Sequence, residues 1–140
     1  TLVLGGDVKA KLWTGADAYL LVQGEVLSLD RDDADWAGAP AGYTLASTQT
    51  SGAYVFADYN WARRYNAGAS YERYEDPDAP DETVDAVGLF AGLALMEETT
   101  VFRFDWRYLQ RDTPAGTSDP IQQATLRVIF SMGPHKAHQF

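Results

Sequence analysis

The sequence predicts an all-β protein whose consecutive strands run up and down in one antiparallel sheet. Polar and apolar side chains alternate along most of the chain, helical periodicity is scarce, and turn-forming segments recur between the alternating stretches. We expect about seven strands, at residues 2–13, 18–29, 52–61, 65–75, 84–96, 99–110 and 121–132. The length of 140 residues fits one domain over residues 1–140.

The composition excludes several classes of function. A net charge of -9, from 20 acidic and 11 basic residues, argues against a nucleic-acid partner. The chain has no cysteine, so it has neither disulfides nor a thiolate metal site. The apolar stretch AVGLFAGLALM is much shorter than the roughly 20 residues that a membrane helix needs. Because GxSxG, HExxH and glycine-rich phosphate-loop motifs are absent, we expect neither an enzyme nor a cofactor.

The lengths of the strands and of their connections favour a transmembrane barrel. The expected strands are longer than the roughly 5–6 residues usual in soluble sheets, and they match the roughly 9–11 residues that cross a bilayer at a tilt. Short connections (WTGAD, ARR and MEET) alternate with long polar ones (residues 30–51, EDPDAPDET and RDTPAGTSDP). An up-and-down barrel in a membrane has this arrangement, with turns at one end and loops at the other.

The period-two alternation assigns one face of the strands to lipid and the other to a lumen. In VFRFDWRY, residues 101–108, aromatic side chains alternate with Arg103, Asp105 and Arg107. The predicted lumen-lining residues are Asp7, Lys9, Lys11, Glu25, Asp58, Glu72, Asp85, Arg103, Asp105, Arg107 and Arg127. The predicted lipid-facing residues are Leu4, Val8, Leu12, Val55, Tyr59, Trp61, Leu89, Leu93, Phe102, Phe104, Trp106, Leu126, Val128 and Phe130. An Arg or Lys on the lipid face would cost roughly 2–4 kcal/mol at the midplane.

The aromatic residues gather near strand ends. Trp13, Tyr19, Trp61 and Tyr65 flank short turns, and Tyr71, Tyr74, Trp106 and Tyr108 are expected near the opposite rim. These positions predict two girdles at the level of the lipid head groups. The alternative is a soluble, lipocalin-like barrel in which the aromatic faces point inward.

The chain resembles the C-terminal portion of a Gram-negative outer-membrane β-barrel of the porin or receptor type. The resemblance covers essentially the whole chain and rests on the order of hairpins and on the end TLRVIFSMGPHKAHQF, where an amphipathic strand runs to Phe140. Gly133, Pro134, Lys136 and His138 depart from the family's terminal pattern, which leaves a short periplasmic extension as an alternative.

The resemblance implies a location in the cell outer membrane of a Gram-negative bacterium, in contact with outer-membrane lipid. Because single-chain barrels of this kind have an even number of strands, about seven strands imply part of a larger barrel. Missing barrel strands or other protein subunits would then complete it. The chain begins without a signal peptide, so any export signal is expected to have been removed or to lie outside this sequence.

Two functions are consistent with these features. One is a porin-like channel or transporter for small hydrophilic solutes, in which Arg103, Arg107 and Arg127 form a basic ladder that orients the solute. The other is a structural or interaction barrel, a membrane-anchored subunit of a surface assembly with a filled lumen. In that second case the arginines pair with the acidic lumen residues and stiffen the wall. The long segment of residues 30–51 would either fold into the lumen or bind a partner outside it.

No metal site is predicted. The acidic segments DRDDAD and EDPDAPDE contain the carboxylates that calcium prefers, but they lack the spacing of an EF-hand, so a solvated acidic surface is favoured. His135 and His138 have a spacing that suits a transition metal, but the sequence supplies no third ligand.

Overall fold

The structure is a computed structural model that describes residues 1–36, 42–95 and 100–130. These residues form one antiparallel eight-stranded sheet. The strands are β1 (Leu2–Gly15), β2 (Ala18–Trp36), β3 (Tyr43–Trp61), β4 (Tyr65–Asp76), β5 (Ala79–Leu95), β6 (Thr100–Thr113), β7 (Gly116–Thr117) and β8 (Ile121–Phe130). In the described ranges, no helix has the length and hydropathy to cross a membrane. The prediction of an all-β, up-and-down antiparallel sheet is confirmed.

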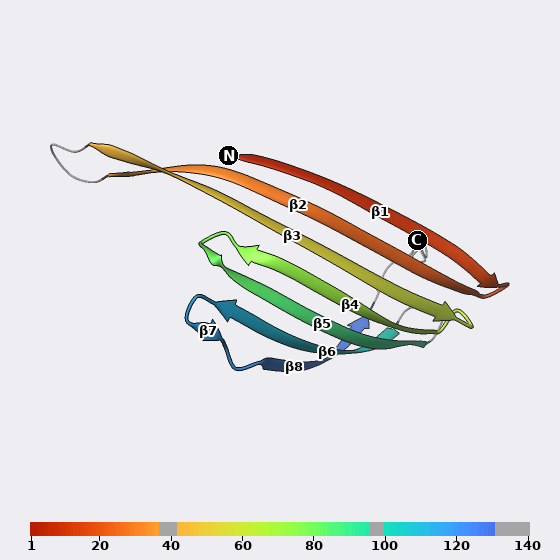
Figure 1. The fold of residues 1–140 in the computed structure, drawn as a ribbon. Coiled ribbons are helices and arrows are strands. Elements are labelled where there is room, and N and C mark those ends of the chain that lie inside the picture. The colour runs from red at the N-terminus through yellow and green to blue at the C-terminus, as the bar shows by residue number, and fades with distance from the viewer. Residues whose placement is uncertain (37–41, 96–99, 131–140) are drawn as a thin grey trace.

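The sheet is curved and, within the described residues, open. β1 forms one edge, and β8, which pairs with β6, forms the other (Figure 1). The described parts of these two edge strands do not pair with each other. All successive pairings between the two edges are antiparallel, and their number is even, so β1 and β8 run in the same direction. The described residues therefore form an open sheet and not a closed barrel.

The predicted polar loop at residues 30–51 is wrong. β2 and β3 pair continuously from Ala18 opposite Trp61 to Trp36 opposite Tyr43, and this hairpin projects beyond the other strands (Figure 1). The Ser and Thr residues before Ser51 fit a pleated strand, and the rings of Trp36 and Tyr43 pack edge to face near the tip, with centroids 5.0 Å apart. Strand-forming residues thus extend the hairpin through a segment whose acidic and glycine-rich composition favours a loop.

Smaller differences affect the other long connections. β5 begins at Ala79, within a predicted loop, after a register shift beside Asp76. The two-residue strand β7 lies in the segment RDTPAGTSDP and pairs with the end of β6. The predictions for Gly133, Pro134, His135, Lys136, His138 and Phe140 lie outside the described residues.

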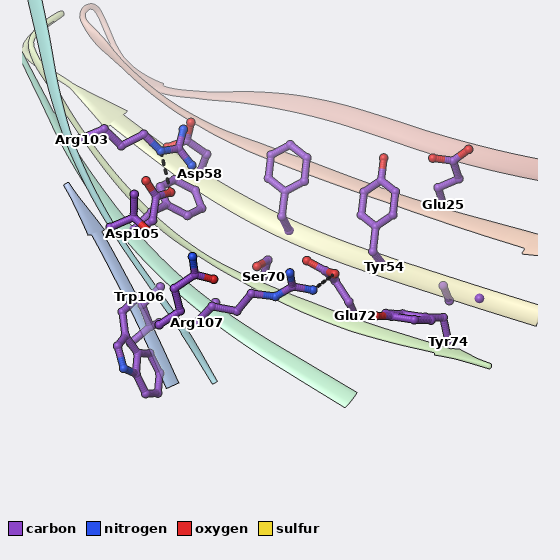
Figure 2. Close-up of a pocket in the computed structure, with 18 of the residues that line it drawn as sticks. Glu25, Tyr54, Asp58, Ser70, Glu72, Tyr74, Arg103, Asp105, Trp106 and Arg107 are labelled. Atoms are coloured by element: carbon purple, nitrogen blue, oxygen red, sulfur yellow. Dashed lines mark hydrogen bonds and ion pairs between the residues drawn. The ribbon is translucent and has the colours of Figure 1, made fainter. Parts of the chain in front are cut away.

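The register divides the side chains into two faces. We call one the concave face; it carries the paired residues Glu25, Tyr54 and Glu72, and the sheet curves around it (Figure 2). We call the other the convex face; it carries residues such as Val55 and Leu89. Side chains that are paired across strands point to the same side of a sheet, so the face of one residue fixes the face of its whole row.

The burial of the two faces is the reverse of that in a water-soluble sheet. Along β5 the concave side chains are buried or half-buried, whereas Val87 and Leu89 on the convex face are 41% and 49% exposed. Among the described residues, the buried apolar side chains are Val84 and Ala86, both on the concave face. The described sheet therefore has no apolar core of the size that a soluble domain of this length needs. Most of its exposed large apolar side chains form an uncovered convex surface, while Val3, Trp13, Leu27, Ile121 and Ile129 are exposed on the concave face.

Small residues let concave side chains pack closely against β4 and β5. The ring of Phe90 lies against Gly68, where an added Cβ would collide with that ring and with the backbone oxygen of Ala57. At Gly92 an added Cβ would collide with the side-chain oxygen of Asn66. The absence of a side chain at these glycines thus allows the neighbouring concave side chains to approach the backbone closely.

Gly68→Ala is expected to destabilise the protein by about 1–3 kcal/mol, because the new methyl group meets backbone that cannot move aside. The matched control is Gly6→Ala, since an added Cβ at Gly6 has no neighbour within 4 Å. Urea unfolding of both variants and the parent protein measures the difference. Equal midpoints for the two variants would contradict the close packing at Gly68.

Candidate functional site

The concave face surrounds an open hollow of about 890 Å³ (Figure 2). Most of its charged lining was predicted from the sequence as lumen-lining: Glu25, Asp58, Glu72, Arg103, Asp105, Arg107 and Arg127. Asp7, Lys9 and Lys11 share the concave face on β1 but lie outside the lining of the hollow. The structure therefore brings the predicted polar residues, with the exception of Asp85, to one side of the sheet.

A cluster of two arginines and one aspartate occupies the β6–β8 side of the hollow. Arg103 and Arg127 are paired directly across the strands, where two like charges destabilise a sheet. Asp105 compensates for this by accepting a hydrogen bond from Arg103 Nε at 2.8 Å and from Arg127 Nη2 and Nε at 2.7 and 3.1 Å. One carboxylate thus serves two guanidinium groups, and the cluster keeps a net positive charge.

A second ion pair crosses the middle of the hollow. Arg107 on β6 reaches over β5 to Glu72 on β4, with Nη2 2.7 Å from Oε2 (Figure 2). The intervening positions of β5 are Ala86 and Gly88, which pair with Glu72 and Arg107 respectively. Because these two residues are small, the longer side chains can meet above the strand. All three predicted lumen arginines are therefore paired with carboxylates of the same face.

Asp85 is a correction to the sequence prediction. The register pairs it with Arg73, and both lie on the convex face. Asp85 accepts hydrogen bonds from Tyr71 Oη at 2.5 Å and from Arg73 Nη1 at 3.4 Å. The prediction is wrong because Asp85 and Val87 are two residues apart on one strand and so share a face.

The β1–β2 side of the concave face carries charges with fewer partners. Asp7 lies directly opposite Glu25, and the part of the chain that is described supplies no ion-pair partner for either. The Lys11 ammonium lies over the rings of Trp13 and Tyr19, 4.4 and 3.9 Å from their centroids. The register places both rings on the concave face, so their expected membership of a lipid-level girdle is wrong.

Aromatic and amide side chains complete the concave surface. Tyr54 and Phe56 stack with centroids 6.5 Å apart, and Gln23 donates a hydrogen bond to Tyr54 Oη at 2.9 Å. The Arg103 guanidinium lies 4.5 Å from the centroid of the Phe90 ring. The alternation of the sequence identifies these positions, because they share the parity of the charged residues on their strands.

The register places every predicted lipid-facing residue on the convex face. At the end with the short turns, Trp61 stacks between Tyr59 and Tyr65, with centroid distances of 5.7 Å on both sides. Toward the other end, Trp106 and Tyr108 lie 6.4 Å apart. Tyr74, predicted for the same rim, is instead on the concave face and lines the hollow.

A network of ion pairs ties the strand ends at the long-loop side. Arg111 donates hydrogen bonds to Glu82 at 2.7 Å and to Asp76 at 3.1 Å, and Arg31 contacts the carboxylate of Asp78 at 3.5 Å. The pKa of Asp76 is lowered, chiefly by the hydrogen bond from the backbone amide of Asp78 and then by that from Arg111. The hydrogen bonds to Glu82 and Asp76 raise the pKa of Arg111.

The lowered pKa of Asp76 predicts a loss of stability in acid. The folded state holds this carboxylate deprotonated more strongly than the unfolded state does, so its contribution is present above the usual aspartate pKa of 3.8. That contribution disappears as the pH falls through the lower pKa of the folded state. Between about pH 5 and about pH 2, the free energy of unfolding is therefore expected to fall less in Asp76→Asn than in the parent protein.

Urea unfolding of the parent protein and of Asp76→Asn across this pH range measures the effect. The control is Asp119→Asn, because the described residues provide no partner for the Asp119 carboxylate. A pH dependence unchanged by Asp76→Asn would contradict the prediction.

The described ranges contain no group of three His, Cys, Asp or Glu residues placed to hold a metal ion. Comparison with protein-family models, curated proteins and solved structures finds no match to this chain. The features that bear on function are the two faces of the sheet: a charged concave face around the hollow and an exposed, apolar convex face.

Proposed function

We propose that the chain is part of the wall of an outer-membrane β-barrel of a Gram-negative bacterium. The convex face contacts lipid, and the concave face lines a water-filled path for small hydrophilic solutes. The two faces of the sheet carry this proposal, because a curved sheet that turns a continuous apolar face outward and its charged side chains toward an inner hollow suits an apolar solvent around it. The same arrangement argues against the soluble lipocalin-like alternative, in which Phe102 and Phe104 would be internal.

Closure of the barrel requires strands beyond those described. β1 and β8 both have an unpaired edge, and they run in the same direction. An odd number of further strands is needed to join these edges in antiparallel fashion. Other parts of the protein or other subunits would supply them, with the same pattern of apolar outer and polar inner side chains.

The hollow supports a path for solutes. Its charged groups remain partly exposed to water: the side chains of Arg107 and Arg127 are 42% and 53% exposed. The cluster of Arg103, Asp105 and Arg127 carries a net positive charge, whereas the β1–β2 side carries the carboxylates of Asp7 and Glu25 together with the ammonium groups of Lys9 and Lys11. A polar solute would therefore meet charges of both signs along this wall.

A second candidate is a structural or interaction barrel with a filled lumen. Two observations favour it: the three arginines are already paired with carboxylates, and the β2–β3 hairpin projects beyond the other strands with its exposed Trp36–Tyr43 pair. In this case the ion pairs serve to hold the strands in register, and the hairpin contacts a partner subunit.

The test is the conductance of the purified protein, with any co-purifying subunits, in a planar lipid bilayer. We expect stable conductance steps whose preference for anions falls in Arg103→Glu and Arg127→Glu. Arg63→Glu is the control, since Arg63 lies at a short turn and pairs with Asp17 away from the hollow. Insertion without conductance would favour the structural barrel, and failure to insert would refute both.

A further inference from the structure

The border between apolar and polar residues on the convex face does not follow the rows of paired residues. Along the convex face, counted from the short turns toward the long loops, the first polar residue is Ser28 on β2 and Ser51 on β3. These two residues pair with each other. On β4, β5 and β6 they are Arg73, Asp85 and Gln110, which form one row. On β3 this row contains Ala53, which pairs with Arg73 and lies two residues nearer to the short turns than Ser51.

The edge strands continue this displacement in the same direction. On β8 the first polar convex residue is Gln122, which pairs with Tyr108, two residues nearer to the short turns than Gln110. On β1 the convex face remains apolar as far as Leu2, which pairs with Asp30, two residues beyond Ser28. The border thus moves toward the short turns from β1 to β8, in steps that all have the same direction.

The size of the displacement gives an angle. From Ser51 on β3 to the row of Gln122 on β8 the border moves four residues over four strand-to-strand steps, which is an average of one residue per strand. In the other direction, from β3 to β1, it moves at least four residues over two steps. With a rise of ~3.4 Å per residue and a strand spacing of ~4.8 Å, a straight border then lies about 35° away from the rows.

We propose that this oblique border is the surface of a lipid bilayer, and that the strands cross the hydrocarbon at about 35° to the membrane normal. This inference rests on the proposed function and adds which residues lie at which depth. Strands of membrane barrels are tilted by ~35–45°, so the angle obtained from the sequence of polar residues fits a planar apolar phase.

The extent of the apolar band favours lipid as its occupant. Between the border and the short turns, no Asp, Glu, Lys or Arg lies on the convex face of the described strands. The band runs without interruption from Val8 at one edge to Leu126 at the other, and both side chains are highly exposed. A protein partner would cover a bounded patch, whereas lipid covers the whole width of a barrel wall.

The two ends of one row provide the sharpest test. Val8 on β1 and Gln122 on β8 lie in the same row of the register, six strand spacings apart. If the strands stood parallel to the membrane normal, both residues would lie at one depth. A tilt of about 35° places Val8 roughly 17 Å deeper on the bilayer axis than Gln122.

The absence of native cysteine makes single-cysteine labelling specific. Val8→Cys and Gln122→Cys, each labelled with a small fluorophore, are reconstituted in phosphatidylcholine vesicles that carry a nitroxide at the head group or deep in the acyl chain. Leu89→Cys, in the centre of the convex face, is the control for contact with lipid. We expect the deep nitroxide to quench Val8→Cys and Leu89→Cys strongly, and the head-group nitroxide to quench Gln122→Cys.

The outcomes separate this inference from the function on which it rests. Equal quenching profiles at Val8→Cys and Gln122→Cys, with Leu89→Cys still deep, would overturn the tilt and leave the membrane wall in place. Absence of lipid quenching at all three positions, in vesicles that retain the folded protein, would overturn both.

Discussion

Leu89→Arg is expected to destabilise the membrane-embedded protein by about 2–4 kcal/mol, which is the cost of a basic side chain on the lipid face near the midplane. Leu89 is 49% exposed on the convex face, opposite Trp106 and in the middle of the apolar band. Folding into phosphatidylcholine vesicles at a series of urea concentrations measures the loss.

The matched control is Ser28→Arg, which places the same side chain on the same face beyond the polar border. We expect this variant to lose less than about 1 kcal/mol, because charged side chains near the interface are tolerated. If both arginines reduced stability equally, or if neither did, the convex face would not be a lipid-contacting surface.

Asp105→Asn is expected to destabilise the protein by about 1–2 kcal/mol and to increase its preference for anions. The substitution leaves Arg103 and Arg127 opposite each other without a counter-charge. Hydrogen bonds to charged groups contribute about 1.5–3 kcal/mol. The lower part of that range applies here, since the Arg127 side chain is 53% exposed and water screens it.

Asp7→Asn is the control, because it removes one negative charge from the same face without removing an ion pair. The double variant Asp105→Asn/Arg127→Gln should regain most of the stability, since it also removes the like-charge contact. Urea unfolding and reversal potentials under a salt gradient measure the two effects. A double variant less stable than Asp105→Asn would contradict the shared-carboxylate arrangement.

The alternation of side chains was sufficient to predict the strands and their two faces. Residues such as Phe104 and Asp105 belong to opposite faces because a strand repeats every two residues, and this rule does not depend on tertiary contacts. The error at Asp85 arose where the chemical character of a residue was given more weight than its parity with Val87. The same parity would have placed Trp13 and Tyr19 beside Lys11.

The extent of the strands and the pairs within the site could not be predicted in this way. The hairpin that ends at Trp36 and Tyr43 depends on cross-strand packing of its two rings, which local composition does not reveal. The ion pair of Arg107 with Glu72 depends on the register of β4, β5 and β6 together, because the two side chains meet above Ala86 and Gly88. Neither feature has a signal within one strand.

The accessibility of successive positions along β3 tests most directly whether the sheet separates lipid from water. Single-cysteine variants at Tyr54, Val55, Phe56 and Ala57 are reconstituted in vesicles and exposed to a membrane-impermeant maleimide and, after labelling, to nitroxide lipids. We predict alternation: reaction with the maleimide at 54 and 56, and protection with lipid quenching at 55 and 57. Equal reactivity at all four positions would contradict a wall with one face in lipid.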